Sequence, residues 1–156
     1  MSIDQEPVNE LSVDDTTKDQ YLTFEIDGEE YGVSISDIKE IISICPITLV
    51  PETPEYVEGI INLRGDIIPV IEVRKRFGKP TKEYDSQTCI VVIEHNIYTI
   101  GLIVDSVKEV IYINSENVLP PPSAKLSHLN QFVRNIGRVG DEIKLLLDLE
   151  KFLIEG

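Results

Sequence analysis

Residues that could carry out chemistry are few in this sequence, and their spacing does not suit a reaction. The two histidines and two cysteines, His95, His128, Cys45 and Cys89, show no metal-ligand spacing, whereas a zinc site needs four protein ligands, or three and a water. With 28 acidic residues, any one pair of carboxylates is uninformative. Phosphate-binding loops, dinucleotide-binding glycine patterns and nucleophile elbows are not found. The sequence therefore predicts no catalytic residue, no metal site and no cofactor.

A charged stretch framed by glycines is a better candidate for contact with another molecule. In NLRGD, residues 62–66, Arg64 follows Gly59 and precedes Gly65, and glycine adopts backbone conformations that other residues resist. Paired with Glu40, Arg64 would most often form a structural ion pair of little worth to stability. At the rim of an apolar groove, the same pair could instead orient a partner helix. The sequence leaves both interpretations open.

The composition is that of an acidic globular protein. The chain has 156 residues and a net charge of −14, which leaves no basic footprint for a nucleic acid. Residues 1–19 hold six acids against Lys18 and predict a disordered acidic tail. No apolar run approaches the roughly 18 residues of a membrane span, and no signal-peptide core is found. We expect a cytoplasmic protein with free thiols at Cys45 and Cys89.

Short strands and turns account for most of the chain. Residues 20–35 alternate apolar and polar on both sides of Asp27-Gly28, which predicts a β-hairpin. Residues 88–113 predict a second hairpin that turns at residues 94–96. Thr53 before Pro54 predicts a short helix over about residues 54–60. Residues 140–154 predict a strand that runs into a short terminal helix.

The chain also resembles itself. Residues 31–42 match residues 100–111 at a constant offset, which pairs Gly32 with Gly101. A second match, with one gap, places Gly65 on Gly140. We expect a duplicated β module with about five strands in each copy, enough for two small barrels around an apolar seam. A chance likeness between two hairpins is the alternative.

In the two copies of the repeat, apolar residues lie close in sequence to equivalent acidic residues. Ile35, Ile38 and Val107 are first interpreted as core residues. Glu40 and Glu109 lie beside them at equivalent places in the two copies. If the core residues reach the surface there, they would be the apolar anchors of a partner-binding groove.

These residues closely resemble the CheW family of bacterial chemotaxis coupling proteins. The likeness is strongest in YVEGIINLRG (56–65) and IIPVI (67–71), and it covers about residues 20–155. It implies an all-β fold with short helices: two SH3-like five-stranded β-barrel subdomains packed around a shared apolar seam. Subdomain 1 would span about 20–85 and subdomain 2 about 86–150 of a CheW-like domain at 20–156. The C-terminal segment is a candidate to pack back on subdomain 1.

The resemblance also implies partners. Family members bridge the histidine kinase CheA, by its CheW-like regulatory domain, to the cytoplasmic tip of methyl-accepting chemoreceptors, without catalysis. The kinase would bind the second barrel, and the protein would be recruited to receptor arrays at the inner face of the membrane without inserting into it. Carried over by position, the receptor-binding residues would be Leu22, Ile35, Ile38, Glu40, Gly59, Arg64, Gly65 and Val107.

The proline loop departs from what the resemblance would lead us to expect. The loop at 119–124 has no aromatic residue to anchor a second kinase contact, which implies a weaker contact there.

The alternative to an adaptor is a small-ligand-binding regulatory domain that uses the inter-barrel seam as a pocket, although the sequence offers few convergent polar groups for it.

Overall fold

The computed structural model describes residues 19–121 and 131–154. These residues form the expected all-β fold with short helices. The helices are η1 (Ile35–Asp37), α2 (Val73–Arg76), η2 (Ser115–Asn117) and α4 (Leu149–Ile154). The strands are β1 (Gln20–Ile26), β2 (Glu29–Ser34), β3 (Ile38–Ser43), β4 (Val57–Leu63), β5 (Asp66–Glu72), β6 (Cys89–His95), β7 (Tyr98–Val104), β8 (Ser106–Tyr112), β9 (Val118–Leu119), β10 (Val133–Val139) and β11 (Glu142–Leu147).

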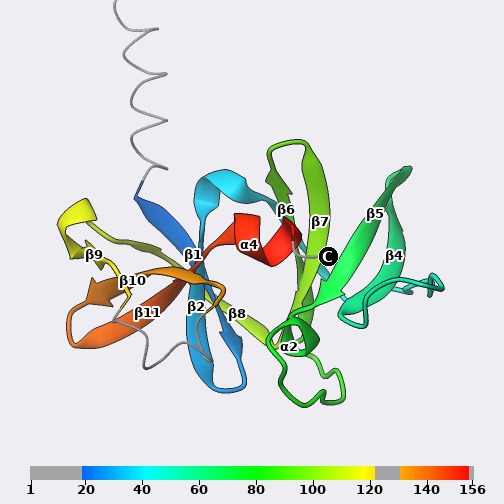
Figure 1. Cartoon of the computed structure of the whole chain (residues 1–156), viewed down its shortest axis with the longest axis horizontal. Helices are drawn as coiled ribbons and strands as arrows, with labels where there is room; N and C mark the ends of the chain where they lie inside the picture. Colours follow the sequence, from blue (N-terminus) through cyan, green and yellow to red (C-terminus); the bar gives the residue numbers. More distant parts are fainter. Residues whose placement is uncertain (1–18, 122–130, 155–156) are drawn as a thin grey trace, which may run out of the picture.

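The strands form two sheets that lie side by side in Figure 1, with α4 between them. One sheet has the order β8-β1-β2-β11-β10-β9, and the other has the order β3-β6-β7-β5-β4. Hairpin neighbours are antiparallel, whereas β2 pairs with β11 and β5 pairs with β7 in parallel. The two orders match strand for strand apart from β9, so the expected duplication is present in the topology.

Each sheet takes strands from both halves of the chain. The six-stranded sheet joins β1 and β2 to β8–β11, and the five-stranded sheet joins β3–β5 to β6 and β7. The sheets therefore do not divide at the expected boundary near residue 85. The reason lies in two short connections: η1 leads from β2 into β3, and Asp105 alone separates β7 from β8. At each of these places the chain crosses to the other sheet, so the two copies exchange strands.

The strand registers correct one detail of the repeat. Val70 lies opposite Gly101 in the parallel pair β5–β7, and Leu146 lies opposite Gly32 in β11–β2. Because Gly32 and Gly101 are equivalent, Val70 is equivalent to Leu146. This register is one residue away from the alignment of Gly65 with Gly140. Both hairpins also turn through two residues, because Leu63 pairs with Asp66 and Val139 pairs with Glu142. The equivalent strands therefore match at one constant offset without a gap, and Gly140 corresponds to Arg64.

An apolar seam joins the sheets. The larger core cluster contains Phe24 and Tyr31 from one sheet and Val91 and Leu102 from the other, all at most 1% exposed. A smaller cluster lies wholly on the other face of the five-stranded sheet. The shared seam predicted from sequence is confirmed, and the burial of its apolar side chains away from water favours the folded state.

Helix α4 closes one end of this seam. Phe152 is fully buried and makes edge-on contacts with Phe77 and Phe132, at centroid distances of 5.9 and 5.6 Å. Arg76 donates a hydrogen bond from Nε to the Phe152 carbonyl oxygen at 3.0 Å. The C-terminal helix thus contacts residues from both halves of the chain. Its predicted strand-then-helix pattern is confirmed.

Local predictions succeed for the first hairpin and fail for the helix at residues 54–60. The second hairpin is present, but it turns at residues 96–97 rather than 94–96, because Glu94 and His95 still pair with β7. The first hairpin turns at Asp27-Gly28, both with positive φ, as predicted. The predicted helix is instead a turn followed by β4. Ile60 exchanges two backbone hydrogen bonds of 2.9 Å with Thr48, and Gly59 has a φ of +151°. These long-range bonds override the local capping signal.

Candidate protein-binding site

The β4–β5 turn presents Arg64 to solvent. Arg64 and Gly65 both have positive φ, at +53° and +92°. Asn62 accepts a hydrogen bond at Oδ1 from the Gly65 amide at 2.9 Å, which fixes the turn. The Arg64 side chain is 67% exposed. The predicted glycine-framed turn is therefore present, with the guanidinium at its tip.

Gly59 serves a different part of the same hairpin. It lies at a register shift in β4, and a Cβ there would come within 2.1 Å of the Thr48 carbonyl oxygen. The segment around Thr48 crosses directly over this position. Gly59 thus lets the strand be covered, whereas Gly65 supports the turn. Gly59 is buried, so a partner protein could not contact it directly.

Glu40 and Arg64 meet as an ion pair between Arg64 Nη2 and Glu40 Oε2. Glu40 lies on β3, at one edge of the five-stranded sheet, and Arg64 follows β4 at the other edge. Because the two edges meet, this sheet curls on itself as a barrel does. The pair is more exposed on the arginine side, so it offers a charged surface as well as a closure contact.

The four apolar site residues lie on or beside the seam cluster but differ in access. Leu22 is 3% exposed and belongs to the cluster itself. Ile35, Ile38 and Val107 are partly buried and pack against the cluster. These three come from the places where the chain crosses between the sheets. A partner could reach their outer edges, whereas Leu22 could only support them from beneath.

Three exposed apolar side chains near these residues were missed from sequence. Ile41 is 43% exposed next to Glu40, and Ile67 is 59% exposed beyond the Arg64 turn. Val110, which is 52% exposed on β8, occupies the position equivalent to Ile41 in the repeat. The repeat could have pointed to this pair, because both follow the equivalent acids Glu40 and Glu109. The structure therefore exposes more apolar side chains on β3, β5 and β8 than were predicted.

A buried charge network stabilises one end of the seam. The Arg74 side chain is 9% exposed, and its Nε and Nη2 donate to the two carboxylate oxygens of Asp105 at 2.9 and 2.8 Å. Burial alone would raise the pKa of Asp105. Hydrogen bonds from Arg74 and from the Asp27 amide outweigh it, and the pKa lies below its usual value.

Comparison with known protein families shows the family to which this chain belongs. A family model described as the CheW-like domain matches residues 20–155. The chain belongs to the CheW family. The resemblance noted from its residues is thus confirmed over nearly the same span.

Relatives of the family support the same conclusion. A chemotaxis protein CheW of Helicobacter pylori is 36% identical over 134 residues, covering 86% of this chain and 81% of the relative. Another, from Klebsiella aerogenes, is 30% identical over 139 residues, covering 89% and 84%. The crystal structure of the scaffolding protein TtCheW from Thermoanaerobacter tengcongensis matches with a TM-score of 0.81 and 37% identity, over 87% of this chain and 92% of that one. The predicted pair of SH3-like subdomains is confirmed.

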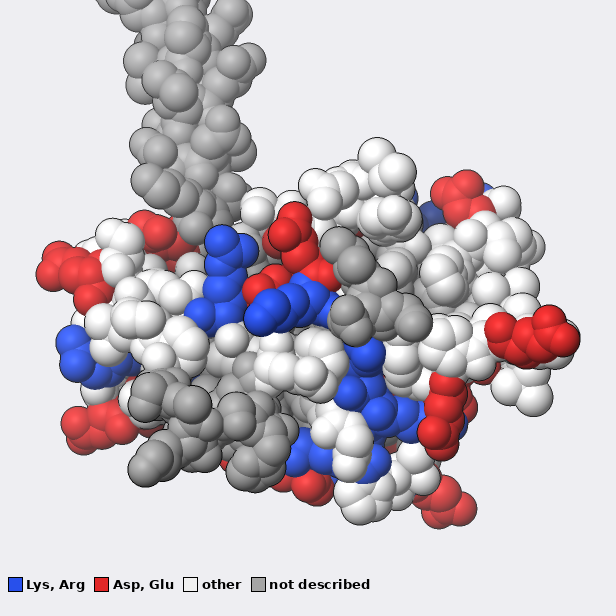
Figure 2. Space-filling view, viewed as in Figure 1, with Lys and Arg blue, Asp and Glu red and all other residues white. Residues whose placement is uncertain are grey.

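Surface charge is unevenly spread on this CheW-family domain. In Figure 2 Lys and Arg side chains run across the middle of the visible face, while acidic side chains lie toward both ends and also beside the basic ones in the middle. That middle region is where α4 and α2 lie in Figure 1. Basic side chains are thus concentrated in this region, with acidic ones beside them, although the whole chain carries −14.

The described residues contain neither a candidate metal site nor a membrane-spanning helix. Within residues 19–121 and 131–154, no group of three or more His, Cys, Asp and Glu is placed to hold a metal ion. Cys45 and Cys89 are free and partly buried, and burial raises the pKa of the Cys89 thiol. None of the helices in these ranges is long and apolar enough to cross a membrane. His128, the acidic tail up to residue 18 and part of the proline loop lie outside the described residues.

Proposed function

We propose that this chain is a non-catalytic chemotaxis adaptor that couples the histidine kinase CheA to methyl-accepting chemoreceptors. Membership of the CheW family supports this proposal, as do relatives named as chemotaxis and scaffolding proteins. The observation that carries it is the Glu40–Arg64 ion pair at a solvent-exposed turn, next to partly buried apolar residues of the seam. This chemistry suits binding and offers no reaction.

The receptor side of the proposal is a helix bound in an apolar groove. Ile35, Ile38 and Val107 would supply the contact area, and Leu22 would support them from the core. A helix recognised in this way gains affinity from apolar anchors, while charges at the rim set its register. Glu40 and Arg64 are placed for that second role.

Gly59 and Gly65 would act indirectly. Gly65 supports the turn that holds Arg64 outward. Gly59 lets the segment at Thr48 cover β4, which fixes the root of the same hairpin. Both glycines therefore shape the proposed surface without contacting the receptor.

The kinase would bind a separate face on the second barrel, through its own CheW-like regulatory domain. Residues 86–150, the range expected for that barrel, supply β8–β11 of the six-stranded sheet and β6 and β7 of the five-stranded sheet. Two separate faces are what an adaptor needs, because both partners must bind at once. The protein would then work in the cytoplasm, recruited to receptor arrays at the inner face of the membrane.

Co-sedimentation with receptor cytoplasmic fragments and CheA tests this proposal. We expect wild type to enter the ternary complex and Arg64→Glu to keep CheA but lose the receptor. Lys82→Glu is the matched control, since Lys82 is exposed and forms an ion pair with Asp85 in the segment between α2 and β6, outside the β4–β5 turn and outside β8–β11. Circular dichroism should show that both variants fold. Undiminished receptor capture by Arg64→Glu would contradict the receptor site, and capture of neither partner by wild type would contradict the function.

A further inference from the structure

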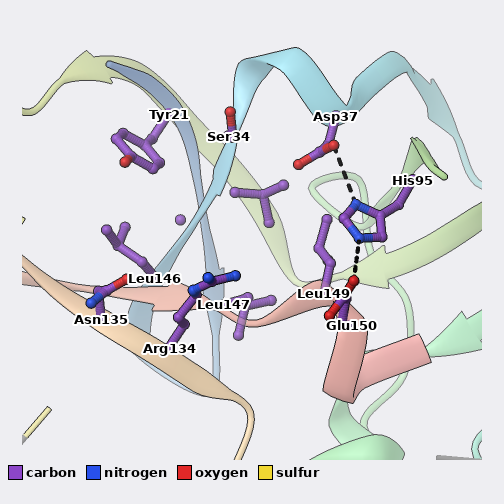
Figure 3. Close-up of a pocket in the computed structure, with 12 residues that line it drawn as sticks. Tyr21, Ser34, Asp37, His95, Arg134, Asn135, Leu146, Leu147, Leu149 and Glu150 are labelled. Atoms are coloured by element: carbon purple, nitrogen blue, oxygen red, sulfur yellow. Dashed lines mark hydrogen bonds and ion pairs between the residues drawn. The ribbon is translucent and has the colours of Figure 1, made fainter. Parts of the chain in front are cut away.

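A cavity of about 400 Å³ lies where the six-stranded sheet meets η1, the end of β6 and α4. Figure 3 shows Tyr21 and Asn135 on one side of it, with Ser34 at its upper edge. The cavity opens where the parallel strands β2 and β11 separate. Their pairing ends at Gly32 and Leu146. In the other sheet, the equivalent pairing continues two residues further.

The internal repeat shows that the fold itself does not require this cavity. Tyr21 is equivalent to Ile90, and Ser34 is equivalent to Ile103, as the strand registers show. Ile90 and Ile103 are at most 1% exposed and pack in the smaller apolar cluster. One copy thus fills the space with aliphatic side chains, whereas the other places a phenol and a hydroxyl there. Forgoing apolar burial lowers stability, which suggests that the polar lining serves another purpose.

Charges of opposite sign surround the cavity. Arg134 comes from β10, and in Figure 3 its guanidinium ends among the lining residues. Within the described residues, Arg134 takes part in no hydrogen bond or ion pair. Figure 3 shows Asp37, His95 and Glu150 together on the other side. An unpaired cation thus faces a group that holds two carboxylates.

The acidic side is itself incompletely paired. His95 Nδ1 lies 3.4 Å from Asp37 Oδ1, and Nε2 lies 3.9 Å from Glu150 Oε2. The second distance is too long for a hydrogen bond. Nε2 is buried and has no hydrogen-bond partner among the described residues. Buried polar atoms are nearly always paired, so this nitrogen and the neighbouring carboxylate could accept a further ligand group.

We propose that this cavity binds a small zwitterion, an amino acid or short peptide with an apolar side chain. Its carboxylate would pair with Arg134, because a guanidinium binds a carboxylate through two hydrogen bonds. Its ammonium group would lie near Asp37 and Glu150. The apolar side chain would lie on Leu146 and Leu149, which also line the cavity. A volume of about 400 Å³ is within the usual range for small-molecule sites. This proposal is independent of the adaptor function.

Backbone-amide NMR of the full chain tests the proposal, with L-leucine and L-leucyl-L-leucine as probes. We expect saturable shifts at the amides of Tyr21, Ser34 and Asn135 for at least one probe. Leucinamide, which lacks the carboxylate, and 4-methylpentanoate, which lacks the ammonium group, should both bind more weakly. Equal binding of either analogue would overturn the assignment of charges, and no saturable shift with leucine or the dipeptide would overturn the site.

Variants locate the binding. Arg134→Ala should weaken binding by roughly tenfold or more, since it removes a charge-assisted pair. Arg138→Ala, on the same strand, should leave it unchanged. Ser34→Ile places the aliphatic residue of the other copy in the cavity and should abolish binding. Unchanged binding by Arg134→Ala or Ser34→Ile would contradict the proposal. If either variant fails to fold by circular dichroism, the analogue comparison on wild type still decides.

Discussion

Arg74 donates two hydrogen bonds to the carboxylate of Asp105, from Nε to Oδ1 at 2.9 Å and from Nη2 to Oδ2 at 2.8 Å. Arg74 lies on α2, near the end of the first copy of the repeat. Asp105 is the single residue between β7 and β8. The Asp27 amide donates to the same carboxylate at 2.8 Å. One carboxylate therefore joins α2, the β1–β2 turn and a crossing between the sheets.

Loss of this carboxylate should be costly. We expect Asp105→Ala to lower the free energy of unfolding by about 3 kcal/mol, because removing one partner of a buried ion pair leaves the other charge uncompensated. Asp105→Asn, which keeps an acceptor oxygen, should lose less. Urea unfolding followed by circular dichroism measures both. Equal losses for the two variants would show that packing, rather than charge, is responsible.

Acid should weaken the same network. The folded-state pKa of Asp105 lies below its usual value, so its contribution to stability is present above the usual pKa of aspartate and is lost as pH falls through the folded value. We expect the free energy of unfolding to fall below about pH 4. Asp105→Asn should show a shallower fall. Urea midpoints over a pH series measure the difference, and identical slopes would contradict the assignment.

The sequence predicted local structure and charge better than it predicted the exchange of strands. Alternation around Asp27-Gly28 was enough for the first hairpin, because a turn of this kind is set by neighbouring residues. The ion pair that the sequence raised as one interpretation of Glu40 and Arg64 is present. The sheet that each strand joins depends on the short crossings at η1 and Asp105, and periodicity holds no information about which copy a strand will pair with.

At the candidate site, too, local patterns were predicted from sequence and long-range contacts were not. The sequence placed Leu22 among the expected receptor-binding residues, whereas the structure places it in the core, because alternation shows which residues share a face and not how completely that face is covered. The failed helix at 54–60 has a different cause. A Thr-Pro start is a local signal, whereas the bonds between Thr48 and Ile60 come from a segment outside that window. The position of Gly59 under Thr48 could not be predicted for the same reason.

The two site glycines should respond differently to substitution. We expect Gly59→Ala to lower the free energy of unfolding by about 3 kcal/mol or more, because a Cβ overlaps backbone and the φ is unfavourable. Gly65→Ala meets no atom within 4 Å and should lose only about 1 kcal/mol for its positive φ. Thermal unfolding compares them. Similar losses would mean that the crossing at Thr48 yields easily.

Arg64→Gly should remove the guanidinium with little effect on the fold. Arg64 holds a φ of +53°, which costs a non-glycine residue roughly 1–2 kcal/mol. Its ion pair is exposed and worth at most about 1 kcal/mol. The two effects oppose each other, so the free energy of unfolding should stay within about 1 kcal/mol of wild type. Chemical unfolding measures this, and a larger loss would mean that the pair closes the barrel more strongly than its exposure indicates.

Tyr84→Phe should reveal a buried carboxylate by its pH dependence. Tyr84 donates to Glu72 Oε2 at 2.6 Å, and Glu72 is 4% exposed. Burial raises the pKa of Glu72, and the bond from Tyr84 opposes that rise. Without the hydroxyl the charged carboxylate loses a donor, so at pH 7 we expect a loss of about 1.5–3 kcal/mol.

The loss should shrink as pH falls, because the carboxyl group becomes protonated in the folded variant and no longer needs the same donor. Unfolding in urea at neutral and at mildly acidic pH measures the change. Tyr98→Phe is the matched control, since Tyr98 is 52% exposed on β7, and it should stay within about 0.5 kcal/mol of wild type at both pH values. A loss for Tyr84→Phe that does not depend on pH would mean that the hydroxyl acts through packing of the loop and not through the charge of Glu72.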